Sequence, residues 1–457
     1  MRIPATPPSI LKIISERAIS SEKVLELLTV CGPTDGRSRY LHWDKLRYLK
    51  PPAGLTSEEV WVGTKLARQA LLKALPLRDR QQQPFRFALP DSVLRMLYEI
   101  DQEGKRFMRQ PISIARTKEA YLVSSLMEEA ISSSQLEGAS TTRKVAEEML
   151  RQLREPKSHS EQMILNNYHA MHFVRENNQE DLTPSMIFEL HRIVTLRQAQ
   201  GPPKRRYIDD PDLAGRLRTE HDRVQVISNR SQDILHTPPN ADELPDRLRQ
   251  LCEFANAHDP NSFIHPIIKA ILLHFMLAYD HPFVDGNGRT ARALFYWLMA
   301  RQGYWFTQFL SISRVIKSAP IQYGRAFLHT ETDDNDTTYF IIHQLEVIKK
   351  AIDHLHQQLE KNAQELEAAE ELLDRASFFA GQLNHRQLSL LKHALKHPNA
   401  VYTIKEHQTS HRVSYQTART DLLKMADHMG LLRKRKAGKS FIFISPSDLK
   451  QRMESAS

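Results

Sequence analysis

One stretch of this sequence combines more functional side chains than any other, and it reads His281-Pro282-Phe283-Val284-Asp285-Gly286-Asn287-Gly288-Arg289-Thr290-Ala291-Arg292. The residues before it, Ile267–Ala278, are apolar nearly all round, which predicts a central and buried helix. A second helix is predicted at about Arg289–Arg301 and ends before Gly303. The pattern therefore predicts a buried helix, a tight glycine-rich loop and the N-terminus of a new helix.

Such a loop favours an anion, because backbone N–H groups are unpaired at a helix N-terminus and the helix dipole adds partial positive charge there. Gly286 and Gly288 allow the backbone to approach a phosphate closely. Arg289 and Arg292 are three residues apart and share a face of the new helix, where they could clamp a polyphosphate. No Walker-type loop and no dinucleotide fingerprint occurs in the chain, so the predicted phosphate site is of another kind.

Two more loop residues point to chemistry. Asp285 is a hard oxygen ligand of the type that a Mg²⁺-bound nucleotide requires, and His281 at the loop entrance can take up a proton near neutral pH. The alternative is a plain helix–loop–helix turn, with glycine for geometry and arginine for solvation. A base, an acid, two glycines, an asparagine and two arginines within twelve residues favour the phosphate site.

The same residues resemble the signature of the Fic (Fido) family, HxFx[D/E]GNGRxxR, at every defined position. The resemblance extends outward over roughly residues 1–350. Its further matches are Phe263–Pro266, Leu182–Pro184, Ala214–Arg218, and the opening segments Arg2–Pro4 and Leu41–Trp43. It implies a protein adenylyltransferase, a nucleotidyltransferase that moves AMP from ATP to Ser, Thr or Tyr hydroxyls of a target protein and of itself.

The resemblance also assigns roles within the loop. It makes His281 the general base, and Asp285 the residue that holds Mg²⁺ between the α- and β-phosphates. The α- and β-phosphates are cradled by Asn287 and the amides of Gly286 and Gly288. Arg289 neutralises the β-phosphate and Arg292 reaches the γ-phosphate. A kinase-like variant of the family has lysine in place of Gly288, so the glycine here favours nucleotidyl transfer.

Two other segments resemble family features. A hairpin predicted at about residues 224–236, with Ile234, Leu235 and His236 in its second strand, resembles the flap that pairs with the target segment; a plain surface hairpin is the alternative. Tyr323 falls where some Fic proteins place an aromatic residue near the adenine, and a core tyrosine is an equal alternative.

Residues Ser133–Gly138 resemble the Fic inhibitory motif [S/T]xxxE[G/N], which implies auto-inhibition. In relatives with this motif N-terminal to the catalytic loop, the glutamate pairs with the second motif arginine, here Glu137 with Arg292, and ATP then binds unproductively. Ser133 lies one helical turn away and could support that contact. An ordinary helix C-terminus capped by Gly138 is the alternative. In some relatives the same glutamate positions a water that removes AMP.

The positive charge is concentrated near the C-terminus. Residues 385–440 hold 12 Lys/Arg and 3 Asp/Glu, a surplus equal to the net charge of +9 of all 457 residues. Helices are predicted at Gln387–His397, Thr403–His407 and Ser414–Met429, with strands at Leu431–Arg435 and Phe441–Ile444, the pattern of a winged helix. The candidate DNA contacts are Ser414, Tyr415, Gln416 and Arg419 on the recognition helix and Arg433, Lys434, Arg435, Lys436 and Lys439 on the wing. A protein-docking or structural role is the alternative.

Composition limits the class of protein. Hydrophobic residues make up 41% of the chain, which excludes a wholly disordered protein. Two distant cysteines exclude a disulfide scaffold and a Cys-based zinc site and fit a reducing compartment. Because no signal core or apolar span is evident, we expect a soluble, cytoplasmic protein that does not contact membrane. The sequence leaves a homodimer open.

The expected fold is mainly α, with a Fic (Fido) helical core, a small β-hairpin flap and a C-terminal winged-helix (α+β) domain. The predicted regions are an N-terminal helical region at 1–105, an inhibitory helix region at 106–181, the Fido catalytic domain at 182–347, a helical linker at 348–380, the winged helix at 381–448 and a tail at 449–457. Two rivals to the auto-inhibited adenylyltransferase remain. One is a DNA-binding regulator that uses the Fic domain as a nucleotide sensor, and the other is a Fic enzyme that removes AMP or transfers another nucleotide.

Overall fold

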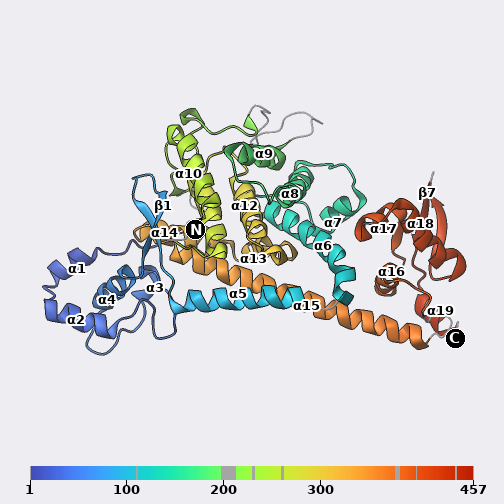
Figure 1. Cartoon of the computed structure of the whole chain (residues 1–457), viewed down its shortest axis with the longest axis horizontal. Coiled ribbons are helices and arrows are strands. Elements are labelled where there is room, and N and C mark those ends of the chain that lie inside the picture. Colours follow the sequence, from blue (N-terminus) through green and yellow to red (C-terminus); the bar gives the residue numbers. More distant parts are fainter. Residues whose placement is uncertain are drawn as a thin grey trace. The chain divides into compact units, whose positions relative to one another are not determined.

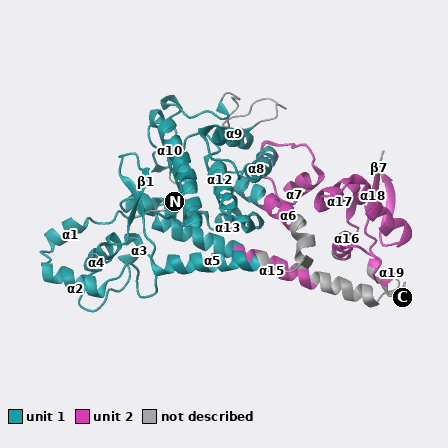
Figure 2. Cartoon of the chain, viewed as in Figure 1, with its two compact units in different colours: residues 1–108, 129–140, 162–351 teal, residues 109–128, 141–161, 352–457 magenta. Residues whose placement is uncertain are grey.

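The computed structural model describes residues 2–109, 112–196, 213–228, 232–258, 262–375, 381–397, 399–437 and 440–455. The chain divides into two compact units (Figure 2): unit 1 holds residues 1–108, 129–140 and 162–351, and unit 2 holds residues 109–128, 141–161 and 352–457. Helices dominate the chain (Figure 1), as predicted. The region boundaries proposed from the sequence rest on composition and motifs and stay a prediction.

Two helices form the centre of unit 1. α11 (Pro266–Asp280) and α12 (Asn287–Arg301) pack against each other, and 13 of the 15 residues of α11 are buried. The predicted central helix is therefore confirmed. α11 begins with proline at its first turn, and the His265 side chain accepts a hydrogen bond from the Ile267 N–H as its cap.

Several shorter helices surround this pair. α9 packs on α12 and α10 packs on α11. The sequence predicts a helix at Pro184–Val194 that begins after Thr183. This start is confirmed, since the Thr183 hydroxyl accepts a hydrogen bond from the Met186 N–H as the cap of α9. The bounds are α9 (Pro184–Thr195), α10 (Leu244–Asn256), α13 (Ile312–Ser318), α14 (Pro320–Thr332) and the long α15 (Thr338–Arg375), with 3₁₀ turns η2 (Glu220–Asp222), η3 (Ala241–Glu243) and η4 (Trp305–Phe309).

The N-terminal part of unit 1 is a small helical layer followed by a hairpin. Its elements are α1 (Ile10–Glu16), α2 (Ser21–Val30), α3 (Trp43–Leu46), α4 (Ser57–Gln69), β1 (Lys73–Arg78), β2 (Pro84–Phe87) and α5 (Asp91–Arg109). From the sequence alone we expect a helical stretch over Ser57–Leu75, but α4 ends at Gln69, so this expectation is wrong at its end. Pro76 cannot continue a helix and restricts the residue before it to extended conformations, so the chain enters β1 instead.

The flap and the inhibitory motif lie on separate elements. β3 (Val226–Ile227) pairs antiparallel with β4 (Ile234–His236), as predicted for the hairpin; residues 229–231 lie outside the described residues. The motif Ser133–Gly138 spans the end of α6 (Ile112–Leu136), and Gly138 takes a φ of +98°. α7 (Arg143–Gln152) and α8 (His159–Glu176) follow.

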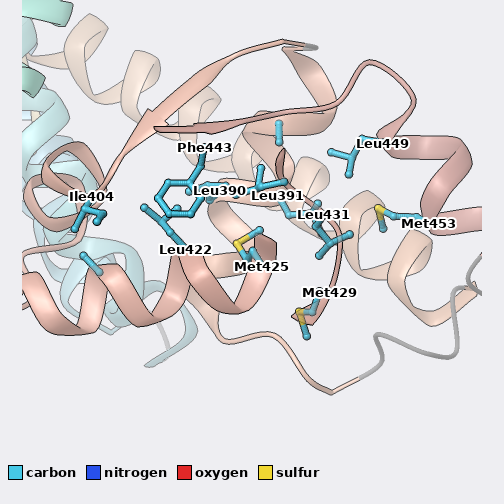
Figure 3. Packing of buried hydrophobic residues seen from close by; sticks show 13 residues of the cluster. Leu390, Leu391, Ile404, Leu422, Met425, Met429, Leu431, Phe443, Leu449 and Met453 are labelled. Atoms are coloured by element: carbon cyan, nitrogen blue, oxygen red, sulfur yellow. The ribbon is translucent and has the colours of Figure 1, made fainter. Parts of the chain in front are cut away.

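The C-terminal part of unit 2 contains the predicted helices and strands around one apolar core (Figure 3). Phe443, Leu391 and Leu422 are fully buried there. The elements are α16 (His385–Lys396), β5 (Val401–Thr403), α17 (Ile404–His411), α18 (Tyr415–Leu423), a π-helical turn (Lys424–His428), β6 (Arg433–Ala437), β7 (Ser440–Ile444) and α19 (Leu449–Ser455). The sheet order is β5-β7-β6; the short strand β5 was not predicted. No helix in the described part of the chain has the length and apolarity needed to span a bilayer.

Candidate active site

The glycine-rich loop is held in shape by its own polar groups. His281 caps α11 in the left-handed conformation, with φ +46°, and Gly286 reverses the chain with φ +79° before α12 begins. The Asn287 side chain closes the loop, since its oxygen accepts from the Phe283 N–H at 3.0 Å and its nitrogen donates to the Phe283 carbonyl at 2.7 Å. Asn287 therefore fixes the loop backbone through both of its amide atoms.

His281 is a neutral imidazole bonded through one ring nitrogen. Its Nδ1 lies 3.2 Å from the Ala278 carbonyl, which only accepts hydrogen bonds, so Nδ1 carries the proton and Nε2 keeps a free lone pair. Burial lowers the pKa of His281 to about 4, although its bond to Ala278 acts in the opposite direction. The ring is therefore neutral at pH 7, the form in which it can accept a proton.

A second segment fastens the entrance of the loop. Arg218 donates through Nε to the His281 carbonyl at 2.8 Å and through Nη2 to the Pro239 carbonyl at 2.5 Å. Its backbone N–H donates to the Pro282 carbonyl at 2.8 Å. Sequence reasoning quoted Arg218 only as part of a family resemblance and gave it no role, because nothing local indicates which carbonyls it will meet.

The last turn of α9 lies against the other end of the loop. The buried Arg289 donates to the Val194 carbonyl of α9 at 3.0 Å, and its Nη2 lies 3.1 Å from Asp285 Oδ2. His191 bonds to the Asp285 carbonyl at 2.9 Å. Sequence reasoning missed His191; its signal was a single histidine on the apolar side of a predicted helix.

The carboxylate of Asp285 could coordinate a metal ion. Its side chain is 38% exposed, whereas its partner Arg289 is 2% exposed. Among the described residues there is no group of three or more His, Cys, Asp or Glu placed to hold a metal. One carboxylate together with substrate phosphates is a usual arrangement for Mg²⁺, so the residue type fits that ion.

The predicted inhibitory pair is in contact. Glu137 Oε1 accepts from Arg292 Nη2 at 2.8 Å, and Arg292 also donates through Nε to the Ser133 hydroxyl at 2.9 Å. A Cβ added to Gly288 would collide with Glu137 Oε1, so the carboxylate lies directly over the N-terminus of α12. Burial disfavours the charge of Arg292, but Glu137 offsets this and the pKa of the guanidinium is raised.

The helix that carries Glu137 is anchored elsewhere as well. Glu129, two turns earlier on α6, accepts from the Ser311 hydroxyl at 2.8 Å and from the Ser313 N–H at 3.0 Å at the start of α13. Burial raises the pKa of Glu129 despite these bonds. The position of Glu137 over the loop is therefore fixed by a buried network and does not depend on one ion pair.

Tyr323 lies close to this network. Its hydroxyl is 2.9 Å from His274 Nε2 of α11. Burial raises the pKa of Tyr323 to about 12, while the nearby Arg292 partly opposes this. The aromatic ring also packs among Phe327 and Phe340. These contacts favour the core-tyrosine interpretation and leave the adenine contact a prediction.

The flap is tied to the body of unit 1 through His236. Its Nε2 donates to the Tyr279 carbonyl at 2.7 Å, and its Nδ1 lies 2.7 Å from Glu331 Oε2. Leu235 is half-buried and Ile234 is 49% exposed. The pairing of β4 with β3 shifts register, so Leu235 is an extra residue between the pairs Val226–His236 and Ile227–Ile234.

The side chains proposed to contact DNA differ in their hydrogen bonds and ion pairs. The sequence also predicts Ser414 as the N-cap of its helix. This is confirmed, since the Ser414 hydroxyl accepts a hydrogen bond from the Thr417 N–H at the start of α18. Tyr415, Gln416 and Arg419 are exposed. On the wing, Lys434 Nζ is paired with Asp427 at 2.6 Å. Arg433, Arg435 and Lys436 are exposed, and Lys439 lies outside the described residues.

The segment that carries this geometry matches a known family. The Fic/DOC family model matches residues 181–299, which include the loop, α9, the flap and the central helix pair. The chain contains a Fic domain. The resemblance of this segment to the Fic family is confirmed. The matched residues end at 299, in the C-terminal part of α12, so the long α15 and the basic C-terminal region lie beyond the match.

Curated relatives match over parts of the chain. Protein adenylyltransferase Fic of Nematostella vectensis is 35% identical over 125 residues, 27% of this chain and 24% of the relative. Protein adenylyltransferase fic-1 of Caenorhabditis elegans is 27% identical over 236 residues, 51% of this chain and 42% of the relative. The chain therefore spans less than half the length of these relatives.

Solved structures also match. A Fic family protein from Desulfovibrio desulfuricans aligns with a TM-score of 0.47 and 15% identity, over 78% of this chain and 96% of that one. Fic-1 from C. elegans aligns with a TM-score of 0.46 and 19% identity, over 79% of this chain and 90% of that one.

Proposed function

We propose that the protein is an auto-inhibited protein adenylyltransferase, which transfers AMP from ATP to a hydroxyl of a target protein and of itself. The observation that carries the proposal is the complete loop His281–Arg292 with a neutral His281 at its entrance. The named activity of the curated relatives, protein adenylyltransferase, supports the same reaction.

The residues of the loop suit phosphoryl chemistry. A target hydroxyl oxygen would attack the α-phosphorus of ATP, the bond from that phosphorus to the pyrophosphate oxygen would break, and the hydroxyl proton would pass to His281 Nε2. Charge on the phosphates would be met by Arg289, Arg292 and the amides at the start of α12. Positioning and charge neutralisation provide most of the catalysis in such reactions. Asp285 would hold Mg²⁺, which neutralises phosphate charge when bound.

The contact of Glu137 supports the inhibitory part of the proposal. Its carboxylate lies over Gly288 and accepts a hydrogen bond from Arg292. It therefore occupies the guanidinium and the helix N-terminus that would otherwise bind a polyphosphate. A γ-phosphate and this carboxylate are both anions and compete for the same guanidinium. The wild-type protein is therefore expected to be nearly inactive until Glu137 moves.

The position of the label identifies the reaction. The variant Glu137→Gly is incubated with Mg²⁺ and with ATP labelled on either the α- or the γ-phosphate, in the presence and absence of cell lysate. We expect protein to acquire the α-label and not the γ-label. Transfer of the γ-label would indicate a kinase, and no transfer of either label by a protein that binds ATP would refute the proposal.

We infer a second function, DNA binding, for the C-terminal part of unit 2. The supporting observation is the shared face of Arg433 and Arg435: they alternate with Lys434 along β6, are exposed, and lie opposite Ile444 and Ile442 of β7. Exposed arginines along one strand suit phosphate contacts, although Arg433 Nη2 also lies 3.6 Å from Asp448 Oδ1.

The salt dependence of binding tests this function. The full chain and the variant Arg433→Ala/Arg435→Ala are titrated with a fluorescent duplex of about 25 base pairs at several salt concentrations. If both arginines contact phosphates, the slope of log K against log salt should fall by about 1.8 in magnitude. Lys12→Ala, an exposed charge in unit 1, is the control. No binding at low salt, or an unchanged slope, would favour a protein-docking role.

A further inference from the structure

We propose that His191 is a positioning residue that holds the Asp285–Gly286 peptide in the orientation required for phosphate binding. This inference rests on the proposed function, because the Gly286 amide belongs to the predicted phosphate cradle. His191 lies on α9, outside the signature loop, and is fully buried. Its substitution is expected to change the rate of the reaction through the loop backbone.

Both ring nitrogens of His191 are bonded to backbone. Nδ1 accepts from the Gly215 N–H at 2.9 Å, so the proton is on Nε2, which donates to the Asp285 carbonyl at 2.9 Å. Burial lowers the pKa of His191 to about 4, and the ring stays in this neutral form at pH 7. The ring also stacks on Phe283, with centroids 3.7 Å apart and an angle of 7°. Its position and its tautomer are therefore both fixed.

The bond to Asp285 sets the direction of one amide. A peptide unit is planar, and this chain has no cis peptide bond among the described residues, so the carbonyl of Asp285 and the N–H of Gly286 point in opposite directions. With the carbonyl held toward His191, the Gly286 N–H faces away from α9. Within the described chain this N–H has no hydrogen-bond partner, which leaves it free for a ligand oxygen. If the peptide turned over, a carbonyl oxygen would face the phosphates and repel them.

α9 packs closely against Gly286. A Cβ at Gly286 would lie 2.9 Å from Thr195 Cγ2 and 3.3 Å from His191 Nε2, so α9 approaches the loop as closely as glycine allows. The Asn287 side chain secures the Phe283 end of the loop. His191 is the described side chain that bonds the Asp285 carbonyl, and it links this end of the loop to α9.

Two isosteric variants separate the two bonds of the ring. Glutamine places its amide near the position of Nε2 and can still donate to the Asp285 carbonyl, whereas asparagine places its oxygen near Nδ1 and keeps only the bond from Gly215. Both are made in the Glu137→Gly protein. We expect His191→Asn to lower kcat by about 10- to 100-fold, because a buried carbonyl loses its partner, and His191→Gln to stay within about 3-fold.

A second readout keeps this test separate from the proposed function. Amide hydrogen exchange in the peptide covering residues 281–288 is measured for the full chain with each variant, and the control is His329→Asn, which removes a buried imidazole stacked on His42. Faster exchange for His191→Asn alone supports the inference. Equal exchange and equal kcat in the Asn and Gln variants, or parallel losses of kcat and melting temperature in both, overturn it. If the Glu137→Gly parent transfers no AMP, the proposed function fails while the exchange data still decide the role of His191.

Discussion

Replacing Glu137 by glycine should raise the rate of AMP transfer by about 10- to 100-fold, since a charged hydrogen bond contributes about 1.5–3 kcal/mol and 1.4 kcal/mol is a factor of ten. The substitution removes the carboxylate that lies over Gly288 and bonds Arg292 at 2.8 Å. The positive groups at the start of α12 then become available to the phosphates of ATP. The measurement is incorporation of α-labelled AMP into protein over time, for wild type and variant, at several ATP concentrations.

The control for this variant is Gln135→Gly. Gln135 lies in the last turn of the same helix and bonds Lys317, so glycine there perturbs α6 without removing the carboxylate at Arg292. Its rate should remain near that of wild type. A Glu137→Gly protein that is no faster than wild type at any ATP concentration would show that the contact with Arg292 does not inhibit. A Gln135→Gly protein as active as Glu137→Gly would assign the inhibition to the position of α6 as a whole.

The helices, helix caps and hairpin that depend on residues close together in the sequence could be predicted. The buried α11 and the start of α12 follow from the apolar run Ile267–Ala278 and from the glycines after it. The cap Thr183 and the flap hairpin were predicted for the same reason, since local backbone preferences decide them. The pairing of Glu137 with Arg292 could be predicted only through resemblance to a family motif, since 155 residues separate them.

Contacts between distant segments were not predictable in this way. His191 and Arg218 bond backbone carbonyls of the loop from 94 and 63 residues away. A buried histidine or arginine can donate a hydrogen bond to any backbone carbonyl that the fold brings near. The sequence around the side chain does not indicate which carbonyl this will be. Lys434 illustrates the same limit in unit 2. The sequence predicts that it contacts phosphates, whereas in the structure its Nζ forms an ion pair with Asp427. The Fic signature identifies the residues that would contact substrate. The residues that hold those side chains in position can be identified only from the three-dimensional structure.

Replacing His281 by alanine should lower the rate of AMP transfer by the Glu137→Gly protein about 10²- to 10⁴-fold, the range that general base catalysis provides. His281 Nδ1 donates its proton to the Ala278 carbonyl, so Nε2 is the ring nitrogen that can accept a proton. Binding of Mg²⁺-ATP, measured by calorimetry, should change little. An exposed histidine of the same unit, His221, is replaced by alanine as the control. A His281→Ala protein that keeps more than about a tenth of the rate would exclude a base at this position.

The pH profile distinguishes a base from a merely structural histidine. Burial lowers the pKa of His281 to about 4, so the ring is deprotonated and able to accept a proton at every pH above that value. Turnover of the Glu137→Gly protein at saturating ATP should therefore stay level from about pH 8 to about pH 5 and fall only below, whereas a base with the ordinary value of about 6.5 would lose half its rate near pH 6.5. Removal of Glu137 also removes a charge that raises this pKa, so the variant shifts the fall to lower pH. An inflection near pH 6.5 would mean that His281 is solvated during turnover, and that the half-buried ring opens further to water before the proton is transferred.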